Sequence, residues 1–107
     1  MPLSEYQGIQ WMIADMATEI AAARGLGLAA AQKRAAAERY SLEASMAKLF
    51  ASEMAARVTD KALQIHGGYG FTRAIPLERY VRDVRIMRIY EGSSEIQRNI
   101  IARTVLS

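Results

Sequence analysis

Apolar residues recur every three or four positions along most of this chain, which is the spacing of an α-helix that buries one face. A first helix is predicted from about Ser4, a candidate N-cap, to the mid-thirties. Gly25 and Gly27 interrupt its Ala-rich second half, where they either weaken the helix or allow a neighbour to approach closely. The apolar face of this helix is predicted to be Ile9, Ile13, Met16 and Ile20.

A second helix is predicted to begin at Ser41, another candidate N-cap, and to end at Gly67, where glycine favours a C-terminal cap. Glu53 and Arg57 stand four residues apart, a spacing that supports an ion pair along one helix. The apolar face is predicted to be Leu42, Met46, Phe50, Met54, Val58, Ala62 and Ile65.

Two shorter helices are predicted after a glycine-rich loop at residues 67–71. One begins around Pro76, a favoured first-turn residue, and ends near Tyr90. The other begins after Ser93, and Gly92 and Glu95 have the spacing of a capping box. Their apolar faces are Leu77, Tyr80 or Val81, Val84 and Met87, and then Ile96, Ile100, Ile101 and Val105. No segment alternates as a strand does, so the sequence predicts an all-α fold, a four-helix up-and-down bundle.

Composition narrows the classes of function. With 107 residues, 51% of them hydrophobic, the chain is one small domain that can form a core. The absence of cysteine excludes disulfides, thiolate metal sites and cysteine nucleophiles, and the single histidine, His66, argues against a histidine metal cluster. No apolar run approaches the ~20 residues that cross a bilayer. The polar opening is unlike a signal peptide, so a soluble intracellular protein is expected.

Two loops carry residues that could do chemistry. The glycines at residues 67–70 expose backbone N–H groups, which suits a phosphate ligand, but they also fit a helix cap followed by a tight turn. Glu91 lies in a turn just before the last predicted helix. A loop carboxylate held by rigid elements can be catalytic, although most such carboxylates are solvated surface groups. The residues alone leave both alternatives open.

Four arginines stand three residues apart in the third predicted helix, at Arg79, Arg82, Arg85 and Arg88. They could contact the phosphates of a nucleic acid, with tyrosines interleaved, or form a solvated face that pairs with nearby acidic residues. The formal charge of +3 is mild and the stripe is short, which favours the solvated face.

The two loops resemble the signatures of a known family in their amino-acid sequences and in their order along the chain. Residues Gln64–Phe71 resemble the Gln-Ile-x-Gly-Gly-x-Gly-Phe signature of the acyl-CoA dehydrogenases. Residues Arg82-Asp83 and Ile89–Arg98 resemble their second signature. Further matches lie upstream at Pro2-Leu3, Gln7, Ala14–Ala17, Ala23-Arg24 and Ala44–Lys48. The resemblance covers essentially all 107 residues, in order and with matching separations.

The resemblance implies that residues 1–107 are the C-terminal helical domain of a flavoprotein oxidoreductase of fatty acid β-oxidation, without its N-terminal helical and middle β domains. In this family a carboxylate removes the α-proton of an acyl-CoA thioester while a hydride leaves the β-carbon for FAD. Glu91 matches the catalytic glutamate, in the position of the short- and medium-chain type. The isolated fragment is expected to be inactive.

The resemblance also implies ligand contacts. Gly92 matches a glycine that contacts substrate, and Arg103 matches a position near the CoA end. FAD contacts are implied for Gln7, Gln64, Ile65, Gly67, Gly68, Ser93, Ser94 and Glu95. Of these, the stretch from Gln64 to Gly68 meets the FAD of a neighbouring subunit in the family. Glu95 stands where the family often has Gln. No metal is implied.

The implied partners are an acyl-CoA substrate, electron-transfer flavoprotein and further copies of the chain in a dimer or tetramer. The implied location is the bacterial cytoplasm or the mitochondrial matrix. Two other interpretations stay open. The chain could be a helical oligomerisation module with no activity of its own. It could also be an unrelated basic helical bundle that binds nucleic acid, which would leave the two loops unexplained.

Overall fold

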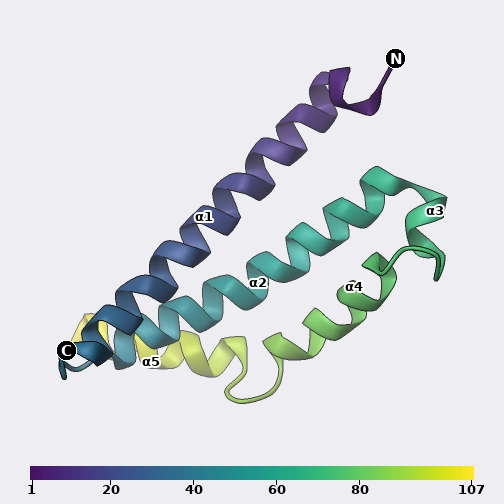
Figure 1. Cartoon of the computed structure of the whole chain (residues 1–107). Coiled ribbons are helices and arrows are strands. Elements are labelled where there is room, and N and C mark those ends of the chain that lie inside the picture. Colours follow the sequence, from purple (N-terminus) through teal and green to yellow (C-terminus); the bar gives the residue numbers. More distant parts are fainter.

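The computed structural model describes all 107 residues, and every regular element in it is helical. The two long helices are α1 (Gln7–Ala35) and α2 (Ser41–His66), and the two shorter ones are α4 (Leu77–Arg85) and α5 (Ser94–Leu106). Three single turns complete the fold: η1 (Leu3–Glu5), α3 (Gly68–Phe71) and η2 (Ile86–Arg88). The predicted all-α fold with four principal helices is confirmed. The up-and-down order holds for α1, α2 and α4, whereas α5 continues in the direction of α4 (Figure 1).

Helix α2 is the centre of the arrangement. It returns alongside α1, and the two lie closest near the turn that joins them and diverge toward the N-terminus (Figure 1). Helices α4 and α5 then follow one another back along α2 (Figure 1). Because α4 and α5 lie in succession against α2, most of α1 is covered on one side only.

The face of α1 that packs on α2 is not the whole face that the sequence predicted. Its partly or fully buried positions are Ile9, Met12, Met16, Glu19, Ala23, Leu26, Ala30 and Lys33. Ile13 and Ile20, which the spacing placed on this face, are 49% and 38% exposed. Helix α1 is so rich in small and apolar residues that it presents two adjacent apolar stripes, and α2 covers only one of them.

Two ion pairs explain why charged residues lie in the packed stripe of α1. Arg57 Nε of α2 lies 2.8 Å from Glu19 Oε1, and Lys33 Nζ lies 2.7 Å from Glu43 Oε1 of α2. The predicted pair between Glu53 and Arg57 along α2 was therefore wrong, because Arg57 is held by α1 instead.

Most helix starts differ from the predicted caps. Ser4 lies inside η1, and α1 begins three residues later at Gln7. Ser41 is the first residue of α2 rather than its cap. Ser93 caps α5 in place of Gly92, since its Oγ accepts a hydrogen bond from the backbone N–H of Ile96 at 3.4 Å. The third predicted helix ends earlier than expected, because η2 replaces its last α-helical turn.

The glycine-rich segment was predicted to be a loop, but residues 68–71 form the single turn α3. Gly67 ends α2 with φ at 63°, as expected for a glycine cap. Gly70 is buried against the end of α2. A Cβ atom at Gly70 would lie 2.8 Å from Leu63 O and 2.7 Å from His66 Cβ. The turn therefore needs glycine at this position so that its backbone can touch α2.

Gly70→Ala is expected to destabilise the chain by about 1–3 kcal/mol, because the added methyl group meets backbone and cannot be accommodated by a side-chain rotation. The matched control is Gly68→Ala in the same turn, where a Cβ atom would meet nothing within 4 Å. Thermal unfolding followed by circular dichroism at one protein concentration measures both. Equal unfolding midpoints for the two variants would contradict the assigned close approach.

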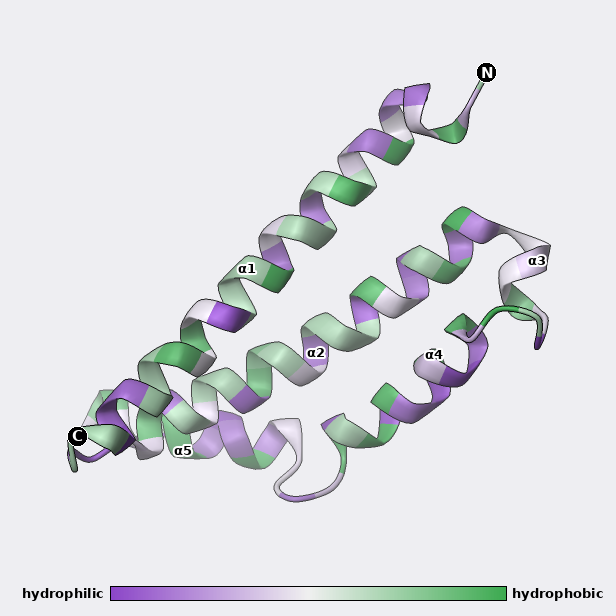
Figure 2. Cartoon of the chain, viewed as in Figure 1, coloured by the Kyte–Doolittle hydropathy of each residue, from purple (hydrophilic) through white to green (hydrophobic).

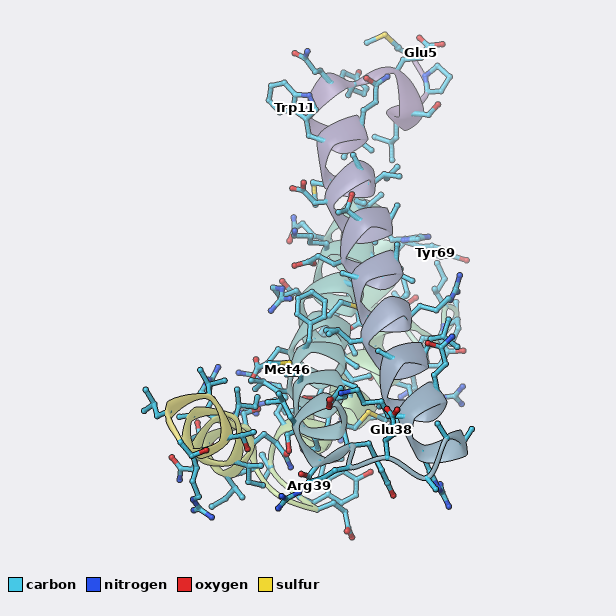
Figure 3. The ribbon with its side chains drawn as sticks, turned by 90° about the vertical axis from the view of Figure 1, so that its left-hand side faces the viewer. Glu5, Trp11, Glu38, Arg39, Met46 and Tyr69 are labelled. Carbon is cyan, nitrogen blue, oxygen red and sulfur yellow. The ribbon has the colours of Figure 1, made fainter.

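The chain leaves more surface exposed than a self-contained domain of its size. Its accessible surface is 7471 Å², whereas a monomer of 11.9 kDa is expected to expose about 6,000 Å². Its radius of gyration is 16.5 Å, against about 13 Å for a compact domain of this length. Ala23 is the only buried hydrophobic residue. Apolar residues recur along the whole of α1 (Figure 2), and several of them are exposed. One of these is Trp11, 63% exposed, which points outward near the N-terminal end of α1 (Figure 3).

Candidate active site

Glu91 lies in the loop between η2 and α5, on an unusual backbone conformation. Its φ is 55° and that of Gly92 is 86°, so two consecutive residues adopt the left-handed conformation. For a residue other than glycine this conformation costs about 1–2 kcal/mol, and such residues cluster at functional sites. The Glu91 side chain is exposed and takes part in none of the ion pairs of the chain. Its carboxylate is thus free to act on a ligand.

An open groove of about 450 Å³ lies directly beside this carboxylate. Its wall is mostly apolar, and the lining residues are Lys48, Ala51, Ser52, Met54, Ala55, Met87, Tyr90 and Glu91. A groove of this kind can accept a hydrocarbon chain and hold it next to a base. The arrangement suits removal of a weakly acidic proton from an otherwise apolar substrate.

The Glu91 loop is fastened to α2 and α5 by side-chain donors. Lys48 Nζ donates to the carbonyl oxygens of Met87, Tyr90 and Gly92 at 2.7, 3.2 and 2.7 Å. Gln97 Nε2 of α5 donates to the same Gly92 oxygen at 3.3 Å. Sequence reasoning named Lys48 only as part of a motif. The available signal was a polar stripe along α2, in which Ser45, Lys48 and Ser52 stand three and four residues apart and are at least partly buried.

Behind the loop, Glu53 of α2 holds α5 and η2 together. Ser94 Oγ donates to Glu53 Oε1 at 2.7 Å, and Arg88 Nε lies 2.9 Å from Glu53 Oε2 as an ion pair. The hydrogen bond from Ser94, followed by the Arg88 guanidinium, lowers the pKa of Glu53 against the opposing effect of burial.

Glu53→Gln is expected to destabilise the chain by about 1–2 kcal/mol at pH 7, since an amide keeps an acceptor for Ser94 but loses the charge that pairs with Arg88. The folded pKa of Glu53 is below its ordinary 4.5, so its contribution is complete above about pH 4.5 and is lost as the pH falls through the folded value. Urea titrations measure the free energy of unfolding of wild type and of Glu53→Gln. The difference between the two proteins should be smaller at pH 3 than at pH 7.

A matched control is Glu78→Gln, which removes a pair along α4 with an exposed arginine, Arg82, whose nitrogen lies 4.0 Å from the Glu78 oxygen. It is expected to change stability by no more than about 0.5 kcal/mol at either pH. An equal loss of stability in the two variants at pH 7 would show that the contacts of Glu53 contribute no more to the free energy of unfolding than the Glu78 pair does.

The structure separates the predicted ligand contacts into two groups. Ser93, Ser94 and Glu95 begin α5 beside Glu91, whereas Gln7 and residues 64–68 lie at the opposite, diverging end of α1 and α2 (Figure 1). Gln64 is about 24 Å from Lys48 along α2, at about 1.5 Å per residue. Gly67 and Gly68 have open space where side chains would stand, so a ligand can approach their backbone.

Within the first group, Ser94 is 3% exposed and its hydroxyl is already bonded to Glu53. Ser93 Oγ is used as the helix cap. What these residues offer to a ligand is therefore the free backbone N–H groups of the first turn of α5. The exposed Glu95 carboxylate stands beside them, 3.9 Å from Arg98.

Arg103 is not brought to Glu91 and Gly92. It lies near the C-terminal end of α5 and lines a separate groove of about 420 Å³ with Arg39 and Ser41. This arrangement does not test whether Arg103 contacts the CoA part of a substrate, and that contact stays a prediction.

Three of the four arginines in the stripe contact other side chains of the same chain. Arg88 pairs with Glu53, Arg82 lies 4.0 Å from Glu78, and the Arg79 guanidinium lies 5.6 Å from the centroid of the Tyr80 ring. These contacts favour the solvated face over a phosphate-binding stripe. No group of three or more acidic or histidine side chains is placed to hold a metal ion. None of the helices is both long and apolar enough to cross a membrane.

Comparisons with known proteins identify the family of the chain and agree with its all-helical fold. The sequence profile described as "Acyl-CoA dehydrogenase, C-terminal domain" matches residues 1–106. Acryloyl-CoA reductase (NADH) from Anaerotignum propionicum is 54% identical over 105 residues, which are 98% of this chain and 27% of that protein. The mitochondrial short-chain specific acyl-CoA dehydrogenase of Bos taurus is 47% identical, over 98% of this chain and 26% of that protein. Butyryl-CoA dehydrogenase from Megasphaera elsdenii superposes with a TM-score of 0.97 at 40% identity, over 100% of this chain and 28% of that one.

Fold and loop together thus define a helical domain that presents a carboxylate beside an apolar groove. The chain belongs to the acyl-CoA dehydrogenase family, within which it matches the C-terminal domain. It spans about a quarter of the length of the relatives it matches, 26–28% in the three comparisons above.

Proposed function

We propose that this chain is the C-terminal domain of an FAD-dependent acyl-CoA dehydrogenase and supplies its catalytic base, Glu91. The observation that carries the proposal is the unpaired carboxylate on a left-handed backbone position at the rim of an apolar groove. Residues other than glycine rarely adopt this conformation, and those that do cluster at functional sites.

The chemistry follows from the position of this carboxylate. An acyl chain in the groove places its α-carbon near Glu91, which accepts the α-proton as the double bond forms between the α- and β-carbons. FAD, when bound, accepts the hydride that leaves the β-carbon. Gly92, the next residue, has no side chain to obstruct the path of the acyl group. The residues that line the groove exclude water from one side of the acyl chain.

The residues at the start of α5 fit one part of the cofactor. Free N–H groups at the start of a helix bind anionic oxygen, so those of residues 93–95 suit the FAD pyrophosphate. The Glu95 carboxylate does not suit a phosphate, but it can accept hydrogen bonds from a hydroxyl or ring N–H. The Ser94 hydroxyl makes no such contact while it is bonded to Glu53.

The separation of the two groups of predicted contacts supports a role for a second copy of the chain. The group near Glu91 serves the FAD of its own subunit, and Gln7 with residues 64–68 serves the FAD of a neighbour. This assignment agrees with the apolar stripe of α1 that α2 leaves open. Electron-transfer flavoprotein as the redox partner, and a location in the cytoplasm or mitochondrial matrix, stay predictions.

The 107-residue chain is expected to self-associate, because apolar side chains including Trp11, Ile13, Ile20 and Leu28 are exposed on α1. Patches of this kind rarely stay in contact with water. Sedimentation velocity over a range of concentrations measures the mass. A chain that stays monomeric at the highest concentration would contradict the oligomer, and Ile13→Glu with Ile20→Glu should shift the equilibrium toward monomer.

The full-length protein provides the test of the proposed function. Purified protein should carry FAD and should reduce an artificial electron acceptor when a saturated acyl-CoA is added, with formation of the 2-enoyl-CoA. The relative from Anaerotignum propionicum is named a reductase, so the assay should also be run with a 2-enoyl-CoA and a reductant. In that direction Glu91 returns the proton to the α-carbon. Absence of turnover in both directions with FAD bound would reject the proposal.

For the chain alone, a helical oligomerisation module is the second candidate. The excess of exposed surface favours it, because the chain is extended in the way expected of a part that packs on others. This role is compatible with catalysis by the complete enzyme.

A further inference from the structure

One side chain of α2 holds the whole loop that carries Glu91. Lys48 Nζ donates three hydrogen bonds, at 2.7 Å to Met87 O, 3.2 Å to Tyr90 O and 2.7 Å to Gly92 O. An ammonium group has three donors, so these carbonyls use its full capacity. Lys48 is thus committed to the backbone of residues 87–92, about 40 positions away in sequence.

The anchored carbonyls lie on both sides of the left-handed pair. Tyr90 O belongs to the peptide just before Glu91, and Gly92 O belongs to the peptide just after Gly92. Gln97 adds a further donor to the second of these. Because both carbonyls are anchored, the backbone of Glu91 and the direction of its Cα–Cβ bond are constrained, in a conformation that a residue with a Cβ atom otherwise rarely adopts.

Lys48 acts on Glu91 only through this backbone. Both residues line the groove, but no ion pair joins the ammonium group to the carboxylate. The positive charge instead faces carbonyl oxygens, including that of Met87 at the C-terminal end of the continuous helical stretch α4–η2, where the helix dipole favours a cation.

We propose that Lys48 is a positioning residue for the catalytic carboxylate: its ammonium group, with all three donors bonded to loop carbonyls, holds Glu91 in reach of the α-carbon through the backbone. The inference rests on the proposed function of Glu91. A misplacement of about 1 Å between reacting groups can lower a rate by about 100-fold. Loss of Lys48 should therefore act on the chemical step and leave the binding of substrate and FAD nearly unchanged.

The test compares Lys48→Met, Lys48→Arg and wild type in the full-length enzyme. Methionine keeps the length and apolar stem of lysine but has no donor. Arginine keeps the charge and donors, but its planar group directs them differently. Lys61→Met is the matched control, because Lys61 belongs to the same helix and has no assigned contact with the loop or the groove. Each variant is measured for kcat, KM, bound FAD and amide hydrogen exchange in residues 86–95.

Lys48→Met is expected to lose about 10- to 100-fold in kcat, with KM and FAD content within about twofold of wild type. Exchange should become faster in residues 86–95 and not in α1, and Lys48→Arg should lie between Met and wild type. If Lys48→Met does not fold, Lys48→Gln replaces it in the same comparison.

A kcat within about twofold of wild type would overturn the proposal. Loss of FAD together with faster exchange throughout the domain would also overturn it, because Lys48 would then be a general structural residue. An inactive wild-type enzyme would reject the proposed function instead, and the exchange of residues 86–95 would still test whether Lys48 anchors the loop.

Discussion

Replacing Glu91 with Gln in the full-length enzyme is expected to lower turnover by about 10²–10⁴-fold or more while FAD stays bound. Glutamine has the size of glutamate and can still make hydrogen bonds, but it cannot accept the α-proton at a useful pH. Folding should change little, because the side chain is exposed and has no ion-pair partner in the chain. The left-handed backbone at this position tolerates both residues to a similar degree.

The measurement is kcat with a saturated acyl-CoA, together with the flavin absorbance of the purified variant. Glu95→Gln is the control, since it lies four residues away and introduces the residue that the family often has there. It should keep its activity. Near-normal turnover of the Glu91 variant would mean that another group is the base. The assignment to the short- and medium-chain type, which rests on the position of this glutamate, would fail with it.

The isolated 107-residue chain is expected to bind no stoichiometric FAD and to show no acyl-CoA turnover. It spans about a quarter of its relatives (26–28%), and the contacts that it can offer fall into two groups about 24 Å apart along α2. Each group provides a few hydrogen bonds. Fixing a large cofactor costs several kcal/mol of translational, rotational and conformational entropy, which so few contacts cannot offset.

Gel filtration followed by an absorbance spectrum checks the FAD content, and the acceptor-linked assay checks turnover. The full-length protein treated in the same way is the control and should elute yellow. A yellow isolated chain with one FAD per subunit would show that this domain by itself forms the cofactor site. The two-group arrangement would then be wrong.

The four principal helices could be read from the sequence because the apolar period reports the geometry of each helix on its own. The same holds for Gly67, whose lack of a Cβ atom makes it a cap wherever a helix ends in the left-handed conformation. The Glu91 loop was found because its amino-acid sequence resembles the second signature of the family. Its position beside an apolar groove agrees with the role that the resemblance implied, and that role awaits the tests above.

Other features depend on how the helices pack against one another and could not be predicted from the local sequence. Helix α1 carries two apolar stripes, and only the position of α2 decides that Met12 and Glu19 are packed while Ile13 is exposed. The single turn α3 exists because Gly70 can touch the end of α2, a contact that propensity does not describe.

Side-chain partners show the same division. The sequence placed Arg57 beside Glu53 by helical spacing, but each carboxylate and guanidinium found a partner on another element, Arg57 with Glu19 and Glu53 with Arg88. Lys48 reaches carbonyl groups about 40 residues away, and backbone carbonyls leave no trace in a sequence pattern. The local period therefore determined which segments are helices, and the sequence of the loop indicated the candidate base. Only the packing of α2 against its neighbours decided which side chains hold that base in place, because the choice depends on distances between segments that the order of residues does not contain.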